Sequence, residues 1–170
     1  VSEAAEFLEK HDDAIVEWIP VNSEGVVDPA SVRTLIEKDP ESVALVTVMW
    51  ANNEVGSVQP IAEITAIAHE YGIPVHTDAV QAFCALEVNF RESGVDTMAI
   101  SGHKIGGPMG IGALIATRQA KMTPVQHGGG QERSVRSGTI DAAAIAGFGV
   151  AAQWGSENLA EESRRIALLR

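Results

Sequence analysis

The feature that most constrains the fold of this chain is a regular alternation of strand-like and helix-like segments. Apolar runs typical of strands occupy residues 14–21, 42–49, 73–78, 96–101 and 111–117. Helical patterns lie between most of these runs, and the continuous apolar run at 42–49 is typical of a strand buried on both faces. This alternation predicts an α/β fold, in which a mostly parallel sheet carries helices on both faces.

Several of the expected helices have recognisable ends. Residues 2–10 have a helical pattern, and Asp28 before Pro29 is typical of an N-cap followed by proline at the first helical position. Pro60 is expected to open another helix, which Gly72 closes as a C-terminal cap.

Two further helices and one antiparallel strand are expected. A short helix should begin near Val80 and a long one near Ile140, and the long one is rich in Ala and Gly up to residue 152. These small side chains predict close packing on the sheet. Only a short glycine-rich link joins the runs 96–101 and 111–117, so one of these strands should be antiparallel to its neighbours. The tryptophans expected in the core are Trp18, Trp50 and Trp154.

Length and charge limit the possible classes of function. The 170 residues are enough for one domain with a real core, so we expect a single domain over residues 1–170. Lys and Arg total 12 against 23 Asp and Glu, and the net charge of -11 disfavours nucleic acid and anionic membranes as partners. The apolar runs are too short for a membrane span. A single cysteine, Cys84, suits a reducing cytoplasm.

Polar clusters follow predicted strands. They occupy residues 51–56, 76–81, 101–104 and 127–139, the last after a short connector. In open α/β sheets, ligands bind at the carboxyl ends of the strands. The sequence therefore predicts a ligand site built from these clusters.

Lys104 lies in the third cluster, beside Ser101, His103 and the amides of Gly106 and Gly107. A solvent-exposed turn lysine is the simplest interpretation. The alternative is a partly buried amine with a depressed pKa, which is a nucleophile and can form a Schiff base. The neighbouring hydroxyl, imidazole and amide donors suit a phosphate group.

Asp78 ends the apolar run 73–77, where its carboxylate should be partly desolvated and in need of a partner. The simpler interpretation is an N-cap for the segment starting at Val80, with Gln81 completing a capping box. However, a strand-end carboxylate, a lysine and a phosphate cradle together are what a protein offers pyridoxal phosphate. The lysine holds the aldehyde, the aspartate keeps the ring nitrogen protonated, and the donors hold the phosphate.

Other types of site are disfavoured. The glycine-rich segment 106–112 precedes a strand and lacks a Lys-Ser or Lys-Thr ending, so it does not fit a nucleotide-phosphate loop. Cys84 lies in the apolar stretch QAFCAL and is expected to be buried rather than nucleophilic. No metal site is expected, because the residues that could ligate a metal lack ligand spacing. Those residues are His69, His76, His103, His127 and Cys84.

Four segments together resemble, in order and spacing, the central part of the cysteine desulfurases. They are NNEVGSVQPI, HTDAVQ, SGHKIGGPMGIGAL and HGGGQERSVRSGT. Cysteine desulfurases are pyridoxal phosphate enzymes of the aminotransferase class-V group, and the last segment is similar to the subgroup that supplies sulfur for iron–sulfur clusters and tRNA thiolation. The resemblance implies the large domain of a fold-type I enzyme. The chain lacks an initiator Met and stops at Arg170 inside a helical pattern, so we expect a central piece of a longer protein.

The resemblance implies a role for each candidate residue at the cofactor ring. Lys104 would bind the cofactor covalently, and Asp78 would pair with the pyridine nitrogen. Gln81 and Asn53 would approach the phenolic oxygen of the ring.

The resemblance also implies the phosphate-binding residues. Ser101 and His103 would hold the phosphate of the same subunit, and Thr139 would contribute to the phosphate site of the neighbouring subunit in a homodimer. Two departures from the family pattern, Met109 for a frequent Lys and Gly106 for an aromatic residue, touch none of these roles.

The implied reaction removes sulfur from L-cysteine. The substrate displaces Lys104, the freed amine moves the Cα proton, and a catalytic cysteine takes the sulfur as a persulfide while alanine leaves. The persulfide would serve a sulfur-acceptor protein such as an iron–sulfur scaffold. The family's nucleophilic cysteine lies C-terminal to this chain and Cys84 does not match its position, so the chain alone is expected to be inactive.

Three alternatives remain open. A class-V aminotransferase or a selenocysteine lyase would share Lys104 and Asp78. A non-catalytic α/β scaffold that binds a partner protein would need neither residue.

Overall fold

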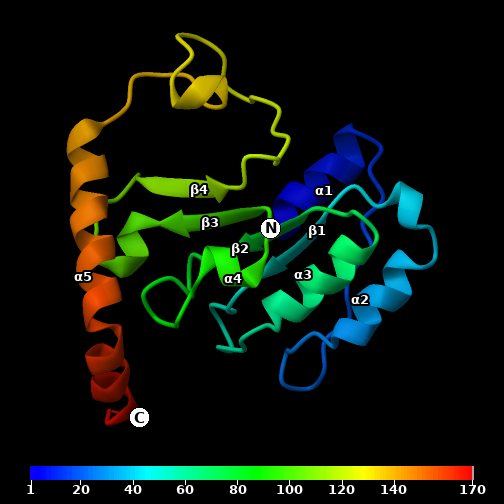
Figure 1. The fold of residues 1–170 in the computed structure, drawn as a ribbon, viewed down its shortest axis with the longest axis horizontal. Coiled ribbons are helices and arrows are strands. Elements are labelled where there is room, and N and C mark those ends of the chain that lie inside the picture. Colours follow the sequence, from blue (N-terminus) through cyan, green and yellow to red (C-terminus); the bar gives the residue numbers. More distant parts are fainter. Residues whose placement is uncertain (170) are drawn as a thin grey trace.

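Four strands form one mixed sheet in a computed structural model that describes residues 1–169 (Figure 1). The expected helical end at Arg170 lies outside the described residues. The first three strands are parallel and the fourth is antiparallel to the third, as predicted. Along the sheet the strands lie in chain order: β1 (Val46–Met49), β2 (Val75–Asp78), β3 (Thr97–Ser101) and β4 (Gly112–Ala116).

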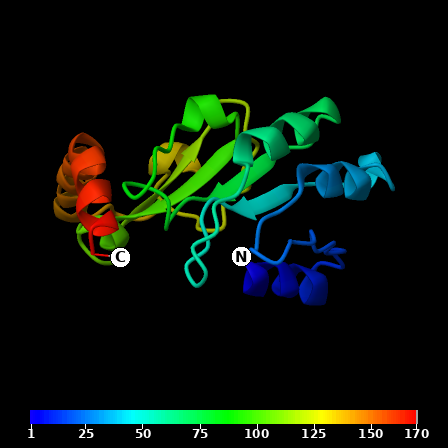
Figure 2. The same cartoon turned by 90° about the horizontal axis from the view of Figure 1, so that it is seen from below.

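The two faces of the sheet differ in burial, because successive side chains of a strand point to opposite faces. On one face the side chains of β1 to β3 are buried: Val46, Val48, Val75, Thr77, Met98 and Ile100. Helices α3 (Ile61–Glu70) and α4 (Phe90–Ser93) lie on that side (Figure 2). Helix α1 (Ser2–His11) lies on the other side and buries none of its residues. The second face therefore stays half-exposed.

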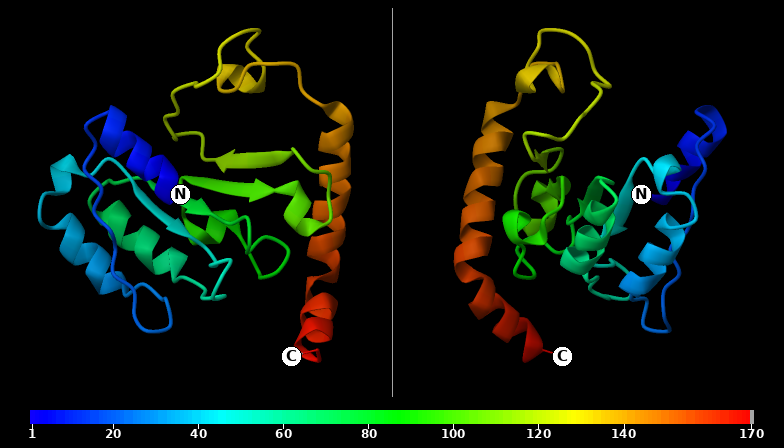
Figure 3. Two further views of the ribbon diagram at one scale, coloured as in Figure 1. Left: turned by 180° about the vertical axis from the view of Figure 1, so that it is seen from behind. Right: turned by 45° about the vertical axis from the view of Figure 1, so that its right-hand side comes forward.

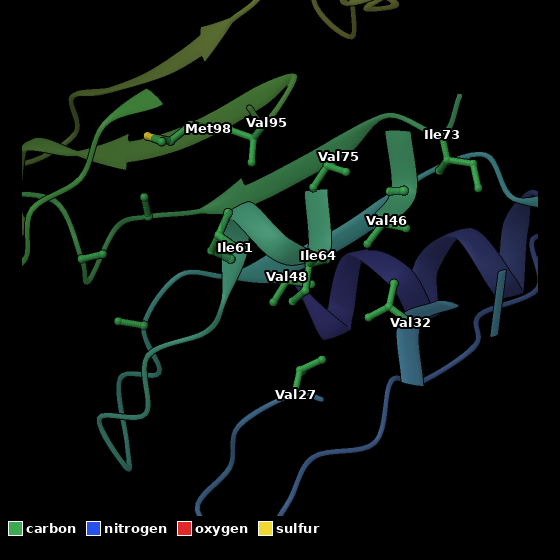
Figure 4. Packing of buried hydrophobic residues seen from close by; sticks show 14 of the residues in the cluster. Val27, Val32, Val46, Val48, Ile61, Ile64, Ile73, Val75, Val95 and Met98 are labelled. Atoms are coloured by element: carbon green, nitrogen blue, oxygen red, sulfur yellow. The ribbon is translucent and has the colours of Figure 1, made fainter. Parts of the chain in front are cut away.

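The core fills the space between the buried face and the helices (Figure 4). Ile64 of α3 is completely buried, and Val32 of α2 (Pro29–Ile36) is 1% exposed. Burying an aliphatic side chain of this size stabilises the fold by roughly 1.5–3 kcal/mol. Outside the core, a bidentate ion pair between Arg33 and Glu70, with both contacts at 2.7 Å, links α2 to α3.

The predicted helix ends are confirmed. The Asp28 side chain accepts a hydrogen bond from the Ala30 amide at 2.9 Å and caps α2. Gly72 has φ +70° and donates its amide to the His69 carbonyl, so the chain turns sharply out of α3 towards β2. The short 3₁₀ helices of the chain are η1 (Pro40–Ser42), η2 (Gly102–Ile105) and η3 (Glu132–Ser134).

The strand predicted at 14–21 is wrong. This segment joins no sheet and makes only an isolated bridge between Val21 and Val27. Ile15 is 90% exposed, whereas Ile19 of the same segment packs against the core. A periodic apolar pattern without a partner for its backbone does not form a strand.

The helix predicted from Val80 is also wrong. Single turns replace it, in which the amide of Phe83 donates a hydrogen bond to the Ala79 carbonyl and the amide of Leu86 donates one to the Ala82 carbonyl. Cys84 has φ +60°, a left-handed conformation that a helix cannot include.

The long helix is present as α5 (Ala142–Ala167), and its Phe148 packs against the core to which the strands contribute. The helix crosses beside η2, however, and does not lie across a face of the sheet (Figure 3). Its small residues do allow close approach, but to loops. A Cβ added at Gly155 would lie 2.7 Å from the Cys84 sulfur, and one added at Gly147 would lie 2.8 Å from Pro108.

Only one tryptophan reaches the core. Trp50 packs against it, whereas Trp18 and Trp154 are 58% and 55% exposed, so the expectation that all three are core residues is wrong. Within residues 1–169, no helix combines the length and apolarity needed to cross a membrane.

Candidate active site

The carboxyl ends of the parallel strands bring the predicted clusters to one edge of the sheet. Met49, Asp78 and Ala99 are Cα partners across β1, β2 and β3. The segment 51–56 follows β1 directly, and η2 follows β3. Polar groups that are far apart in the sequence therefore meet where ligands of open α/β sheets bind.

Lys104 lies on η2, a turn that the backbone holds tightly. The amide of Gly102 donates to the Ile111 carbonyl and the amide of Gly107 donates to the Gly102 carbonyl, both at 2.9 Å. Gly106 ends the turn with φ +80°. The side chain of Lys104 is exposed, so the prediction of an accessible turn lysine is confirmed and the alternative of a partly buried amine is wrong. An exposed amine on a fixed turn is a nucleophile that can reach and attack an aldehyde carbonyl.

Ser101 and His103 form a donor pair next to Lys104. The Ser101 hydroxyl and His103 Nδ1 share a hydrogen bond of 2.7 Å. Ser101 is half-buried at the end of β3, and His103 is exposed on η2. A hydroxyl and an imidazole are groups that bind an anion such as phosphate. The expectation that the amides of Gly106 and Gly107 add to these donors is wrong, because both amides donate to the Gly102 carbonyl within the turn.

Asp78 ends β2 half-buried. Its Oδ1 accepts a hydrogen bond from the Val80 amide at 3.0 Å and so stabilises the turn that follows β2, but it is not a helix N-cap because no helix forms there. The predicted capping box is not formed, because no side-chain hydrogen bond in the described part of the chain involves Gln81. The carboxylate keeps a second oxygen for a partner above the strand end.

Asn53 lies on the exposed turn after β1. The Asn52 carboxamide shapes this turn by accepting from the amides of Glu54 and Val55, and the Asn53 side chain donates to Glu54 Oε1 at 2.8 Å. The amide of Trp50 donates to the Asp78 carbonyl at 2.8 Å, which holds the start of this turn beside the end of β2.

Thr139 lies apart from the other six candidates. It is exposed in the segment between β4 and α5, which loops away from the strands before it enters α5 (Figure 1). Among residues 1–169, no side-chain hydrogen bond joins Thr139 to η2. The role of Thr139 in a neighbouring subunit stays a prediction.

His76 lies in the predicted cluster 76–81, but the sequence assigned it no role in the site. It lies two residues before Asp78 on the same face of β2, and its Nδ1 shares a hydrogen bond of 2.8 Å with the Thr97 hydroxyl. Partial burial lowers the pKa of His76, against the opposing effect of the Asp78 carboxylate. The signal that could have found it is the spacing of two on a strand, which places both side chains on one face.

Cys84 has the environment of a packing residue. It is half-buried against α5, with its sulfur 3.8 Å from the Ala152 carbonyl, and burial raises the pKa of its thiol. A raised pKa leaves less of the nucleophilic thiolate. Within the described residues, no group of three His, Cys, Asp or Glu side chains could hold a metal ion.

Comparison with known proteins places this geometry in a family. Residues 1–168 match the family model of the class-V aminotransferases. The chain belongs to the aminotransferase class-V family, and the predicted resemblance is confirmed.

Individual relatives narrow the similarity. The chain is 45% identical over all its 170 residues to the IscS-like cysteine desulfurase of Mycobacterium tuberculosis, and it spans 43% of the length of that protein. A solved NifS-like protein superposes with a TM-score of 0.89 at 36% identity, over 95% of this chain and 44% of the other. A structure described as SspA in complex with cysteine has a TM-score of 0.82 at 38% identity, over 90% and 44% of the two chains.

Proposed function

We propose that the protein containing this chain is a pyridoxal phosphate-dependent cysteine desulfurase, which removes sulfur from L-cysteine and releases alanine. The sulfur would remain as an enzyme persulfide for iron–sulfur cluster assembly or thiolation pathways. One observation carries the proposal: an accessible lysine on a fixed turn after β3 lies beside a strand-end aspartate on β2. The relatives named as cysteine desulfurases support the choice of reaction.

The donor set fits pyridoxal phosphate. Asp78 offers an anionic oxygen for the pyridinium nitrogen, and the pair Ser101 and His103 offers donors for the phosphate. Asp78 and Ser101 lie on the same half-exposed face of adjacent strands, with Ser101 two residues beyond the Cα partner of Asp78. The backbone at η2 is also crowded, since a Cβ added at Gly107 would lie 2.9 Å from the Gly102 carbonyl oxygen. Bound there, pyridoxal phosphate supplies an electron sink for charge at the substrate Cα.

Each side chain would then have a defined role. Lys104 would hold the cofactor covalently, and its amine would accept the proton from the substrate Cα. Asp78 would keep the ring nitrogen protonated, while Asn53 and Gln81 would orient the ring through its phenolic oxygen. Thr139 serves the phosphate site of a second copy, so we propose a homodimer.

The sulfur-accepting nucleophile is a cysteine outside residues 1–170. A thiolate attacks the substrate sulfur, a sulfur–sulfur bond forms as the carbon–sulfur bond breaks, and Cβ is then protonated to give alanine. Cys84 does not serve, because it is packed against α5 with its thiol pKa raised. The solved relative in complex with cysteine supports L-cysteine as the substrate. A sulfur-acceptor protein would take the persulfide, in the cytoplasm.

Turnover by the full-length protein tests the proposal. The protein loaded with pyridoxal phosphate should convert L-cysteine to alanine and sulfide in equal amounts when a thiol reductant is present. Lys104→Ala should abolish this, whereas Lys121→Ala, which removes another exposed lysine, should not. Selenocysteine lyase activity would show as turnover of L-selenocysteine alone, and aminotransferase activity as transfer of the amino group to a 2-oxo acid. No turnover of any of these substrates would favour a non-catalytic scaffold.

A further inference from the structure

His76 lies directly behind Asp78 on the half-exposed face of the sheet. Thr47, His76 and Thr97 are Cα partners and form one row across β1, β2 and β3. On the same face of the sheet, the next row toward the carboxyl ends is the one that contains Asp78. Two residues along a strand span about 6.6 Å. The imidazole of His76 and the carboxylate of Asp78 therefore belong to adjacent rows on this face, about that distance apart.

Within the described residues, the charged side chain that acts on His76 is that of Asp78 on its own strand, and it favours the protonated imidazole. The side chains that face His76 across the row are uncharged: Thr47 on β1 and Thr97 on β3. Partial burial outweighs Asp78 and lowers the pKa of His76 below its usual value. At neutral pH the imidazole is therefore uncharged, and it is held by Thr97.

We propose that His76 is a positioning residue, a neutral imidazole that leaves the whole charge of Asp78 available to the ring nitrogen of pyridoxal phosphate. This inference rests on the proposed function. A cation at position 76 would compete with the ring for Asp78, and an anion would reinforce Asp78. The ring nitrogen would lie roughly one hydrogen-bond length, about 3 Å, beyond the Asp78 carboxylate. At about 9.6 Å and an effective dielectric constant near 20, one charge changes the acid dissociation constant of the ring nitrogen on the order of twenty-fold.

The experiment measures the ring nitrogen itself. The full-length protein is loaded with ¹⁵N-labelled pyridoxal phosphate, and the ring ¹⁵N chemical shift is followed against pH. His76→Arg should raise the acid dissociation constant of the ring nitrogen on the order of twenty-fold, and His76→Glu should lower it. His76→Gln, which is uncharged and polar, should leave it within a few-fold of the wild type. Ile15 is 90% exposed. Ile15→Arg adds the same charge away from the site and should leave the acid dissociation constant of the ring nitrogen unchanged.

The outcomes separate the two proposals. If the ring nitrogen has the same acid dissociation constant in the Arg, Glu and Gln variants, the role of His76 is overturned. It is also overturned if His76→Gln changes this constant as much as His76→Arg does. If His76→Arg does not fold, the direction of the shift in His76→Glu decides. A wild-type protein that shows no ring signal bound at Lys104 overturns the proposed function instead.

Discussion

Gly102→Ala tests whether the backbone of η2 is what positions Lys104. A Cβ at residue 102 would lie 2.8 Å from Ile111 Cγ2, and 3.1 and 3.2 Å from the carbonyl oxygens of Pro108 and Ile111. Two of these three atoms are backbone and cannot rotate away. Overpacking of this kind costs about 1–3 kcal/mol, and the lower flexibility of Ala in the unfolded chain returns only about 0.4–1 kcal/mol. We therefore expect a net destabilisation of about 1–2 kcal/mol, together with a shifted turn.

The assay has two readings on the full-length protein: the free energy of unfolding in urea, and the fraction of Lys104 linked to pyridoxal phosphate after borohydride reduction. Both should fall in Gly102→Ala, and Ile111→Ala should restore part of each, because it removes the nearest clashing atom. Gly110→Ala is the matched control. It has open space around the added Cβ but φ +79°, so it should lower stability and spare the Lys104 linkage. Wild-type stability and linkage in Gly102→Ala would refute the reasoning.

Three further predictions concern charge and packing. Asp78→Asn removes the negative charge and should weaken cofactor binding and turnover at least tenfold. It keeps the hydrogen bond from the Val80 amide, so little stability should be lost, whereas Asp78→Ala should cost about 1 kcal/mol more in urea unfolding. Arg33 lowers the pKa of the Glu70 carboxyl. The ion pair therefore stabilises the fold above the usual glutamate pKa, and this stabilisation is lost as the pH falls through the lowered pKa. Glu70→Gln should thus lower the melting temperature slightly at pH 7 but not at acid pH. Ile64→Ala should cost about 2–5 kcal/mol in urea unfolding because Ile64 is fully buried, and a smaller loss would contradict its place in the core.

The sequence predicted elements well where local chemistry decides them. Asp28 with Pro29, and Gly72 with its positive φ, mark helix ends through backbone hydrogen bonds within a few residues. The antiparallel fourth strand followed from a link too short to hold the α-helix that a parallel crossover needs. These features depend on neighbours in the chain, so a single sequence contains their cause.

Prediction failed where distant partners decide. The run 14–21 has a strand-like pattern but no strand beside it, and Cys84 has a left-handed backbone that composition does not reveal. The small residues of α5 predicted close packing, but not that the packing partner would be η2 and the turn at Cys84.

The candidate site shows the same division. Lys104, Asp78 and Ser101 could be predicted because strand ends in an open sheet converge at one edge. The exposure of Lys104 was one of two alternatives that the sequence left open, and the structure decides between them. No role was predicted for His76, because its relation to Asp78 and Thr97 depends on strand register, which the sequence does not state.

Mapping the lysine that binds pyridoxal phosphate tests the central claim most directly. The full-length protein is incubated with pyridoxal phosphate, reduced with borohydride, digested and analysed by mass spectrometry. The account predicts the reduced adduct on Lys104. An adduct on Lys10, Lys38 or Lys121 in its place, or no adduct on any lysine, would contradict it.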